Sequence, residues 1–275
     1  MPMCGFPVMH LEKYIKVLVQ ENKLNVALCE ETQRPREGEN KTIDRSVVRI
    51  LTPGTLIDES FLNPYENNYL LAISLSKGDK SKLGLAWIDL PTGELFTQNT
   101  RITSLADDIA RINPREIVLD VTLKESPVLS ITTALKEQTC PISYSQNTEQ
   151  IPGQIHSTSD TAISDDVTIR DPDRASTVFD VEESAATRLL ESYLRTNLFT
   201  NEPLALAPMS DSIQRRMQID AHTLKALEIR ESTSDGHKGK TLLNTIKRTD
   251  TPSGTRLLTR WLCVLISRLV LNWRH

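Results

Sequence analysis

"NYLLAISLSKGDKSKLGLAWIDLPTGELFTQNT", residues 68–100, is the stretch that decides the fold of this chain. It contains three runs rich in β-forming residues, at 68–75, 82–90 and 93–100. The sequences Ser-Lys-Gly-Asp and Pro-Thr-Gly between these runs are typical of turns. Because short turns join neighbouring antiparallel strands, we predict a three-stranded antiparallel meander here.

The residues after the meander alternate between helical and strand patterns. Ser-Leu-Ala-Asp at 104–107 is typical of a capping box at the start of a helix, and Asn-Pro at 113–114 is a stop signal. The further elements expected are a helix at 104–112, a strand in "REIVLD" at 115–120, a helix at 127–137 and a strand in "CPISYS" at 140–145. The order β-β-β-α-β predicts a mixed sheet with helices packed against it.

The residues before the meander predict one helix and two strands. The helix is expected at 9–20, where apolar residues recur at helical spacing: Leu11, Ile15, Leu18 and Val19. "LNVALCEE" at 24–31 is apolar enough for a buried strand, and a polar loop at 32–44 follows it. The second strand lies in "RSVVRILTPGTLID" at 45–58, where two arginines flank a β-branched run that stops at Thr-Pro-Gly-Thr.

The chain changes character after residue 146. Residues 146–175 are rich in serine, threonine and aspartate and poor in large hydrophobics, so a flexible insertion is expected. "VEESAATRLLESYLRTNL" at 181–198 and "SIQRRMQIDAHTLKALEI" at 212–229 then show apolar residues at helical spacing. The inner face expected for the latter helix comprises Ile213, Met217, Ile219, Leu224, Leu227 and Ile229. The predicted fold class is therefore α/β followed by all-α.

Composition is that of an ordinary globular protein. Of 275 residues 39% are hydrophobic and 25% are charged, and the net charge is −4. This balance does not exclude a nucleic-acid partner, because phosphate is bound by local basic patches. The four cysteines are too dispersed for a zinc site or a disulfide scaffold, so free thiols are expected. No targeting segment is visible in the first 20 residues, and no membrane association is predicted.

One motif resembles the end of a nucleotide-binding loop. Gly239-Lys240-Thr241 would match its final residues, but the position five residues before Gly239 is Ser234 rather than glycine. A helical pattern also precedes the motif where a phosphate-binding loop needs a strand. We therefore expect no ATP site here, and predict that Thr241 caps a helix in "LLNTIK".

Acidic residues at strand ends raise the alternative of a Mg²⁺-dependent nuclease. Asp89 and Asp120 each end a predicted strand, and Glu94 lies nearby. The β-β-β-α-β order with such carboxylates is the layout of a ribonuclease H-like nuclease, which requires several acids that converge on two metal ions. Asp107 and Asp108 lie at the start of a helix, where acidic residues are expected for the helix dipole alone. We prefer an inert scaffold.

The other chemical groups define no enzyme. The five histidines are dispersed, and no serine or cysteine lies in a nucleophile motif. The histidines are His10, His156, His222, His237 and His275. The best candidate surface is the basic strand edge formed by Lys41, Arg45 and Arg49, which would bind phosphate through ion pairs and counterion release. The alternative is a solvated strand edge that charge protects from aggregation.

Several of these motifs together resemble one family. "MCGFPVMHLEKYIKVLVQENKLNVALCEE" resembles the "M-A-G-x-P-x-H" to "C-E-Q" block of the MutS DNA mismatch repair proteins, and "VVRILTPGT" is similar to the end of their mismatch-binding domain. "YLLAISL", "LGLAWIDLPTGEL" and "LADDIARINPREIVL" resemble the connector domain. "MQIDAHTLKALEI" and "LLNTIKRTDTPSGTRLLTRWL" resemble the start of the helical core or lever domain.

The resemblance implies four segments. Residues 1–58 would be the C-terminal part of a mixed-sheet mismatch-binding domain, and 64–180 a ribonuclease H-like connector without nuclease activity. Residues 181–263 would begin the helical lever, and 264–275 would be a divergent tail. In the family, a Phe-x-Glu wedge upstream of the first block reads the mismatch, but Phe6 is followed two residues later by Val8. The clamp, the ATPase domain and the dimer-forming helices would follow the lever, so a fragment without enzyme activity is expected.

The implied function is that of the middle of a mismatch repair protein. Arg49 and Arg45 would contact the DNA backbone without reading bases. The expected partners are double-stranded DNA, mismatched in the intact protein, and a MutL-type protein, with a MutS-type dimer only at full length. ATP and Mg²⁺ belong to the intact family, and no cofactor is expected here. The wording is closest to the fungal mitochondrial branch, which implies a mitochondrial location with a nuclear one as the alternative; a short regulator that competes for MutL is also consistent.

Overall fold

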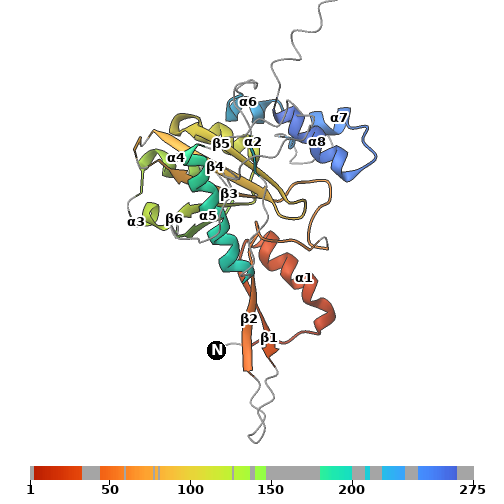
Figure 1. Ribbon diagram of the computed structural model, residues 1–275. Helices are drawn as coiled ribbons and strands as arrows, with labels where there is room; N and C mark the ends of the chain where they lie inside the picture. Colours follow the sequence, from red (N-terminus) through yellow and green to blue (C-terminus); the bar gives the residue numbers. More distant parts are fainter. Residues whose placement is uncertain are drawn as a thin grey trace, which may run out of the picture.

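The computed structural model describes two β-sheets with helices packed around them (Figure 1). The described residues are 3–32, 44–58, 60–76, 78–79, 81–125, 127–136, 140–146, 180–199, 208–210, 219–232 and 241–264. One sheet has six strands in the order β7-β6-β3-β4-β5-β8, and the other is a two-stranded ribbon of β1 and β2. Among the described helices, none has both the length and the apolarity needed to cross a bilayer.

The predicted meander forms the centre of the larger sheet. It comprises β3 (Tyr69–Leu75), β4 (Lys82–Asp89) and β5 (Glu94–Arg101), which pair antiparallel in sequence order as predicted. β6 (Glu116–Asp120) pairs parallel with β3, and β7 (Ile142–Ser145) pairs parallel with β6. A short strand, β8 (Pro208–Ser210), pairs parallel with β5 and was not predicted. The sheet is therefore mixed, as expected from the order of the motifs.

Helices cover both faces of this sheet. On one face lie α2 (Leu105–Ile112) and α4 (Leu129–Lys136), with a short helix, α3 (Val121–Glu125), between them in sequence. The other face is covered by α5 (Val181–Leu198). Because side chains alternate along a strand, Leu71 and Ile73 of β3 belong to the first core, whereas Leu70 and Ala72 belong to the second. The α5 residues in the second core are Ala186, Leu189, Leu190, Tyr193 and Leu194.

The placement of α5 differs from the expected domain boundary at 180/181, which assigned this helix to the helical part of the chain. Its buried face packs on β3 and β4 instead. Gly84 explains how the helix approaches so closely, since a Cβ there would lie 1.9 Å from the Glu182 carbonyl oxygen. The start of α5 thus rests directly on the β4 backbone. α5 therefore belongs to the same structural unit as the six-stranded sheet.

The start of α2 also differs from the predicted capping box. Ser104 is the N-cap residue, but its side chain makes no capping hydrogen bond, and a 3₁₀ turn (Ile102–Ser104) leads into the helix. The Asp107 carboxylate accepts a hydrogen bond from the Ala221 backbone N–H at 2.8 Å instead. Asn113 ends the helix in the left-handed conformation with φ of 54°, in agreement with the predicted stop.

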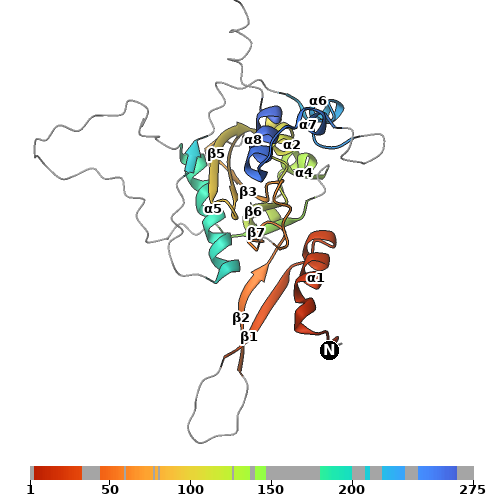
Figure 2. The same cartoon turned by 90° about the vertical axis from the view of Figure 1, so that its right-hand side faces the viewer.

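The ribbon lies at one end of the sheet beside the N-terminal helix (Figure 2). β1 (Val26–Thr32) pairs antiparallel with β2 (Asp44–Leu51), and α1 (Leu11–Ile15) continues as a π-helical segment, Lys16–Glu21. Ile15, Val19 and Leu51 form a small core with Leu56 and Phe61. The prediction of a buried strand at 24–31 was wrong: β2 is the one described strand that pairs with β1, and residues 26–31 of β1 are exposed or half-buried.

The C-terminal helices are short. They are α6 (Ala221–Ala226), α7 (Leu242–Ile246) and α8 (Pro252–Cys263). The predicted long helix at 212–229 was wrong where it can be compared, because Asp220 accepts a hydrogen bond from the Thr223 N–H and so starts a new helix there. Of the expected inner face, Ile229 is buried and Leu227 is exposed, while Ile213 and Met217 lie outside the described residues. Residues 147–175 of the expected insertion and 265–275 of the tail also lie outside them.

Candidate nucleic-acid interface

The two-stranded ribbon carries the most exposed of the predicted site residues. It extends away from the six-stranded sheet, so both of its faces are open over much of its length (Figures 1 and 2). Arg45 lies on β2 with 70% of its side chain exposed, and its guanidinium is 3.4 Å from the Glu31 carboxylate. Exposed ion pairs of this kind contribute at most about 1 kcal/mol. Arg45 can therefore exchange this partner for another anion at little cost.

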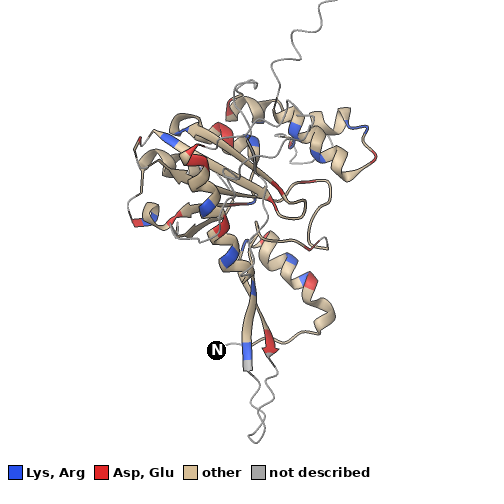
Figure 3. Cartoon of the chain, viewed as in Figure 1, with Lys and Arg blue, Asp and Glu red and all other residues tan. Residues whose placement is uncertain are grey.

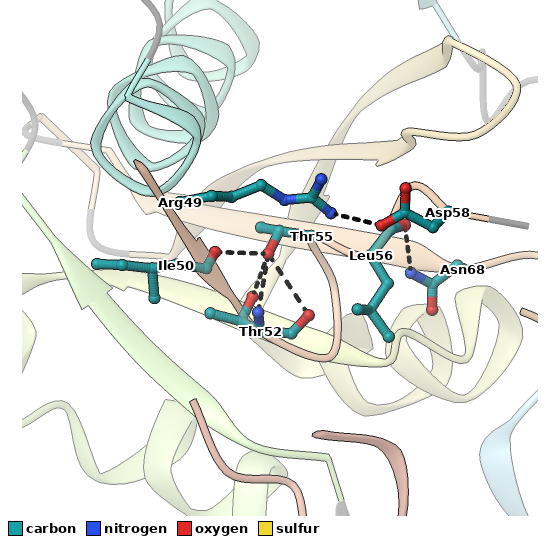
Figure 4. A network of polar contacts seen from close by, with 7 residues as sticks. All are labelled: Arg49, Ile50, Thr52, Thr55, Leu56, Asp58 and Asn68. Carbon is teal, nitrogen blue, oxygen red and sulfur yellow. Dashed lines mark hydrogen bonds and ion pairs between the residues drawn. The ribbon is translucent and has the colours of Figure 1, made fainter. Parts of the chain in front are cut away.

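Arg49 lies at the base of the ribbon, where β2 meets the sheet (Figure 4). Its guanidinium is 3.2 Å from the Asp58 carboxylate, and 23% of its side chain is exposed against 51% for Asp58. The Arg49 Nε is buried and has no hydrogen-bond partner within the described part of the chain. Arg49 is thus a half-enclosed cation, and its acidic neighbour Asp58 lies beyond the Thr-Pro-Gly-Thr turn.

The two arginines point to opposite faces of the ribbon. Arg45 pairs with Glu31 and Arg49 pairs with Leu28, and directly paired residues share a face. Leu28 and Glu31 are three positions apart on β1, so their side chains point to opposite faces. The register shifts by one residue between Leu28 and Cys29, which leaves Val48 unpaired. The spacing of four residues alone would have placed both arginines on one face.

Other basic residues complete the charge distribution around the ribbon. Lys41, the third predicted site residue, lies outside the described residues. Lys13 and Lys16 were not singled out from the sequence, yet both are exposed on the helical segment beside the ribbon, and basic bands are visible there in Figure 3. The signal that could have found them is their position on the polar side of an amphipathic helix whose apolar side holds Ile15 and Val19.

The Thr-Pro-Gly-Thr sequence forms a buried turn that fixes the base of the ribbon. The Thr55 N–H donates to the Thr52 carbonyl at 3.1 Å, and the Thr52 N–H donates to Thr55 Oγ1 at 2.9 Å (Figure 4). Asn68, just before β3, donates to the Pro53 carbonyl at 3.1 Å. Thr52 and Thr55 are both fully buried. The turn is therefore a rigid connection between the ribbon and the sheet.

Phe6 does not project as a free aromatic side chain. Its ring lies 4.5 Å from that of Tyr14, at an interplanar angle of 44°, and it is 42% exposed. An aromatic wedge has to leave its own protein surface to enter a base stack. Phe6 instead covers one turn of the N-terminal helix.

The nuclease alternative is not supported by the geometry. Asp89 pairs with Tyr69 at the start of β3, whereas Leu119, next to Asp120, pairs with Ile73 near its end. Five positions at ~3.3 Å per residue separate the two carboxylates by roughly 16 Å along the sheet. Among the described residues, no group of three or more His, Cys, Asp or Glu side chains could hold a metal ion. The acids do not converge.

Each of these acids has a structural environment instead. Asp89 is 2% exposed, and burial raises its pKa, against the opposing effects of the Asn68 N–H and Arg256. It pairs across the strands with Glu94, whose carboxylate lies 3.9 Å from Arg260. The Asp108 carboxylate accepts hydrogen bonds from Thr100 at 2.6 Å and from Gln98 at 3.0 Å.

The glycine-lysine-threonine motif is placed only in part. Gly239, Lys240 and Ser234 lie outside the described residues. Thr241 is the N-cap of α7, and its Oγ1 accepts a hydrogen bond from the Asn244 N–H at 3.2 Å. The predicted capping role is confirmed.

The order of these parts matches three consecutive domains of one family. MutS domain I matches residues 1–60, MutS domain II matches 68–210 and MutS domain III matches 222–274. The chain belongs to the MutS family. The match to domain II includes α5, in agreement with the packing of this helix on the sheet. None of the three matched domains is the ATPase domain of the family.

Curated relatives agree with this assignment. The DNA mismatch repair protein MutS of Nitrobacter winogradskyi is 31% identical over 265 residues, which cover 94% of this chain and 29% of that protein. MutS of Rickettsia prowazekii is 32% identical over 266 residues, which cover 95% of this chain and 29% of that protein. The chain therefore spans less than a third of the length of these relatives.

Proposed function

We propose that this chain contributes the DNA-facing ribbon, the connector and the start of the lever of a MutS-type mismatch repair protein, and that the ribbon contacts the DNA backbone. The observation that carries the proposal is the placement of Arg45, a highly exposed cation on a projecting ribbon inside the region that matches MutS domain I. Arg49 and Lys41 are the further candidate contacts. The strand order of the sheet supports a ribonuclease H-like connector, and the separation of Asp89 from Asp120 argues against nuclease activity in it.

The electrostatics favour positioning on the backbone over base reading. In duplex DNA the phosphates are strong competitors for an exposed arginine, and each contact releases condensed counterions. Glu31 and Asp58 hold the two ribbon arginines until phosphate replaces them. Contacts of this kind carry no sequence information. Binding would be weak because the net charge of −4 opposes it, and salt-sensitive because phosphate contacts release counterions.

The remaining functions follow from family resemblance. The connector would transmit between the DNA end and the ATPase end of an intact protein and would offer a surface to a MutL-type partner. ATP, Mg²⁺ and the MutS-type dimer would belong to the intact protein. A mitochondrial location follows from the likeness to the fungal mitochondrial branch, with the nucleus as the alternative.

Equilibrium binding to labelled duplexes tests the proposal. Fluorescence anisotropy with the full chain would compare a matched duplex with one that carries a central G·T mismatch. We expect salt-sensitive binding with equal affinity for both, because Phe6 packs on Tyr14 and no glutamate follows it at the wedge spacing. Binding that is absent at low salt, or a clear preference for the G·T duplex, would contradict the proposal.

A further inference from the structure

Glu116 is a fully buried carboxylate at the junction between the ribbon and the sheet. It is the first residue of β6 and is 0% exposed. Its Oε2 accepts hydrogen bonds from the Thr52 hydroxyl at 2.5 Å and from the Gly54 N–H at 2.9 Å. Its Oε1 accepts from the Ser143 hydroxyl at 2.6 Å and from the Tyr193 hydroxyl at 2.5 Å. A buried carboxylate needs such donors, because an unsatisfied one is strongly destabilising.

The four donors come from opposite sides of the junction. Thr52 and Gly54 belong to the turn that ends the ribbon, whereas Ser143 lies on β7 and Tyr193 on α5. Oε2 thus accepts hydrogen bonds from the ribbon side, and Oε1 accepts them from the sheet and its covering helix. Glu116 joins three parts of the chain that are distant in sequence.

The direction of the hydrogen bonds follows from their chemistry. An ionised carboxylate only accepts, so the hydroxyls of Thr52, Ser143 and Tyr193 all donate to it. Since Thr52 Oγ1 donates to Glu116, the contact of 2.9 Å between the two threonine hydroxyls is a donation from Thr55 to Thr52. Burial and the neighbouring Glu116 charge raise the pKa of Tyr193, so its hydroxyl keeps its proton. Every donor is therefore in its ordinary protonation state.

The turn is also closely fitted to Glu116 by shape. A Cβ on Gly54 would lie 2.6 Å from Leu70 Cδ1, 2.9 Å from Glu116 Oε2 and 3.0 Å from Glu116 Cβ. Real Cβ atoms essentially never approach other atoms within 3.0 Å. Glycine is therefore the residue that allows the backbone N–H at position 54 to reach the carboxylate.

We propose that Glu116 is a positioning residue that fixes the direction of the ribbon relative to the six-stranded sheet, and thereby sets where the ribbon arginines meet DNA. The second part of this statement rests on the proposed function; the first does not. Apart from the Glu116 contacts, the turn is held by Asn68, which donates to the Pro53 carbonyl, and by the small core beside the ribbon. Loss of the carboxylate would leave three buried donors and the half-buried Ser143 hydroxyl without their shared acceptor.

Glu116→Gln is the sharpest perturbation, because it preserves shape while replacing one carboxylate oxygen by an NH₂ group. Whichever way the amide turns, two donors would face the NH₂ group. Glu125→Gln is the matched control, since Glu125 is exposed on α3 and the change in charge is the same. Tyr193→Phe removes a single donor and leaves the carboxylate in place, so it decides the question if Glu116→Gln does not fold. Thr52→Val also leaves the carboxylate in place, but it removes the acceptor of the Thr55 hydroxyl together with the donor to Glu116.

Distance measurement between two spin labels would report the ribbon direction without DNA. One label would sit on Cys29, which is exposed on β1, and the other on Lys136→Cys, at the exposed end of α4. Cys4→Ser and Cys140→Ala would remove the other accessible thiols, while Cys263 is buried. The protein is the full chain, and circular dichroism would verify folding of each variant.

We expect a narrow distance distribution for the parent and for Glu125→Gln, and a distribution roughly twice as wide for Glu116→Gln. Thr52→Val and Tyr193→Phe should each broaden it by less. A folded Glu116→Gln with the parent distribution would overturn the proposal, as would Tyr193→Phe without effect if Glu116→Gln fails to fold. Failure to bind DNA would overturn only the proposed function.

Discussion

The Arg49 guanidinium lies 3.2 Å from the Asp58 carboxylate, so the base of the ribbon is tied across the Thr-Pro-Gly-Thr turn to the segment that leads into the sheet. Arg45 has a similar acidic partner in Glu31. Each described ribbon arginine is therefore held by a carboxylate that any phosphate would have to displace. Duplex affinity should accordingly respond to removal of the acid as well as of the base.

Asp58→Asn should strengthen duplex binding several-fold at low salt. The substitution frees Arg49 and removes a negative charge that would repel the DNA backbone. Titration of a labelled duplex by anisotropy would measure the change. Asp79→Asn is the control, since Asp79 is exposed on the turn between β3 and β4 and the substitution changes the net charge equally. An equal gain from both variants would mean that only overall charge matters.

Gly84→Ala should lower the free energy of unfolding, because the new side chain would push α5 away from β4. The new Cβ would lie 1.9 Å from the Glu182 carbonyl, a backbone atom that cannot rotate away. Overpacking typically costs about 1–3 kcal/mol, and a backbone clash belongs at the upper end of this range. Urea unfolding would measure the loss, and Gly78→Ala, where a Cβ meets nothing within 4 Å, is the control. Equal stability of the two variants would refute the close packing of α5 on β4.

The buried Asp89 predicts a decrease in stability as the pH rises. Burial raises its pKa above the ordinary value of 3.8, so the folded protein holds this proton more tightly than the unfolded chain does. Stability is then greatest below the unfolded pKa and is lost as the pH rises through the folded one. Asp89→Asn should therefore make the free energy of unfolding fall less as the pH rises from the ordinary carboxyl pKa of 3.8.

Asp79 provides a control, because its contribution to stability changes with pH in the opposite direction to that of Asp89. Hydrogen bonds from Ser81 lower the pKa of Asp79, so its contribution is present above its unfolded pKa and is lost as the pH falls. Asp79→Asn should therefore make stability decline more steeply with rising pH. If Asp89→Asn and Asp79→Asn shift the pH dependence in the same direction, the assignment of Asp89 is wrong.

Substitutions of Thr241 distinguish a helix-capping role from a nucleotide-binding role. Thr241→Ala should lower the free energy of unfolding by ~1 kcal/mol, whereas Thr241→Ser, which keeps the hydroxyl, should change it much less. ATP with Mg²⁺ should leave the thermal midpoint of the parent unchanged, because a ligand that binds the folded state raises this midpoint. A rise in the midpoint that Thr241→Ala abolishes would restore a phosphate-binding role.

The central meander could be predicted from the sequence because its signals are local. Each strand is bounded by turn residues, and Asn113 adopts the left-handed conformation expected where the helix stops. The cap at Thr241 was predictable for the same reason: the hydroxyl and the N–H that it accepts are three residues apart. Short-range chemistry of this kind needs no knowledge of the tertiary fold.

The sequence predictions that failed concern which element covers an apolar face. The apolar run at 24–31 has the composition of a core strand, yet among the described strands it pairs only with β2. The period of α5 gives its buried face but not the identity of the sheet beneath it. The pairing of Arg49 with Asp58 and the opposite faces of the two arginines depend on a turn and on the unpaired Val48. None of these features could be predicted from the sequence pattern of a single helix or strand.

The salt dependence of duplex binding by the full chain and by Arg45→Ala is the most direct test of backbone contact by the ribbon. A phosphate contact at Arg45 predicts that the slope of log affinity against log salt becomes shallower by about 1 in this variant. Arg101→Ala, which removes an exposed arginine from the end of β5, should keep the parent slope. Equal slopes for the parent and Arg45→Ala, or the same decrease in Arg101→Ala, would contradict a DNA-binding ribbon.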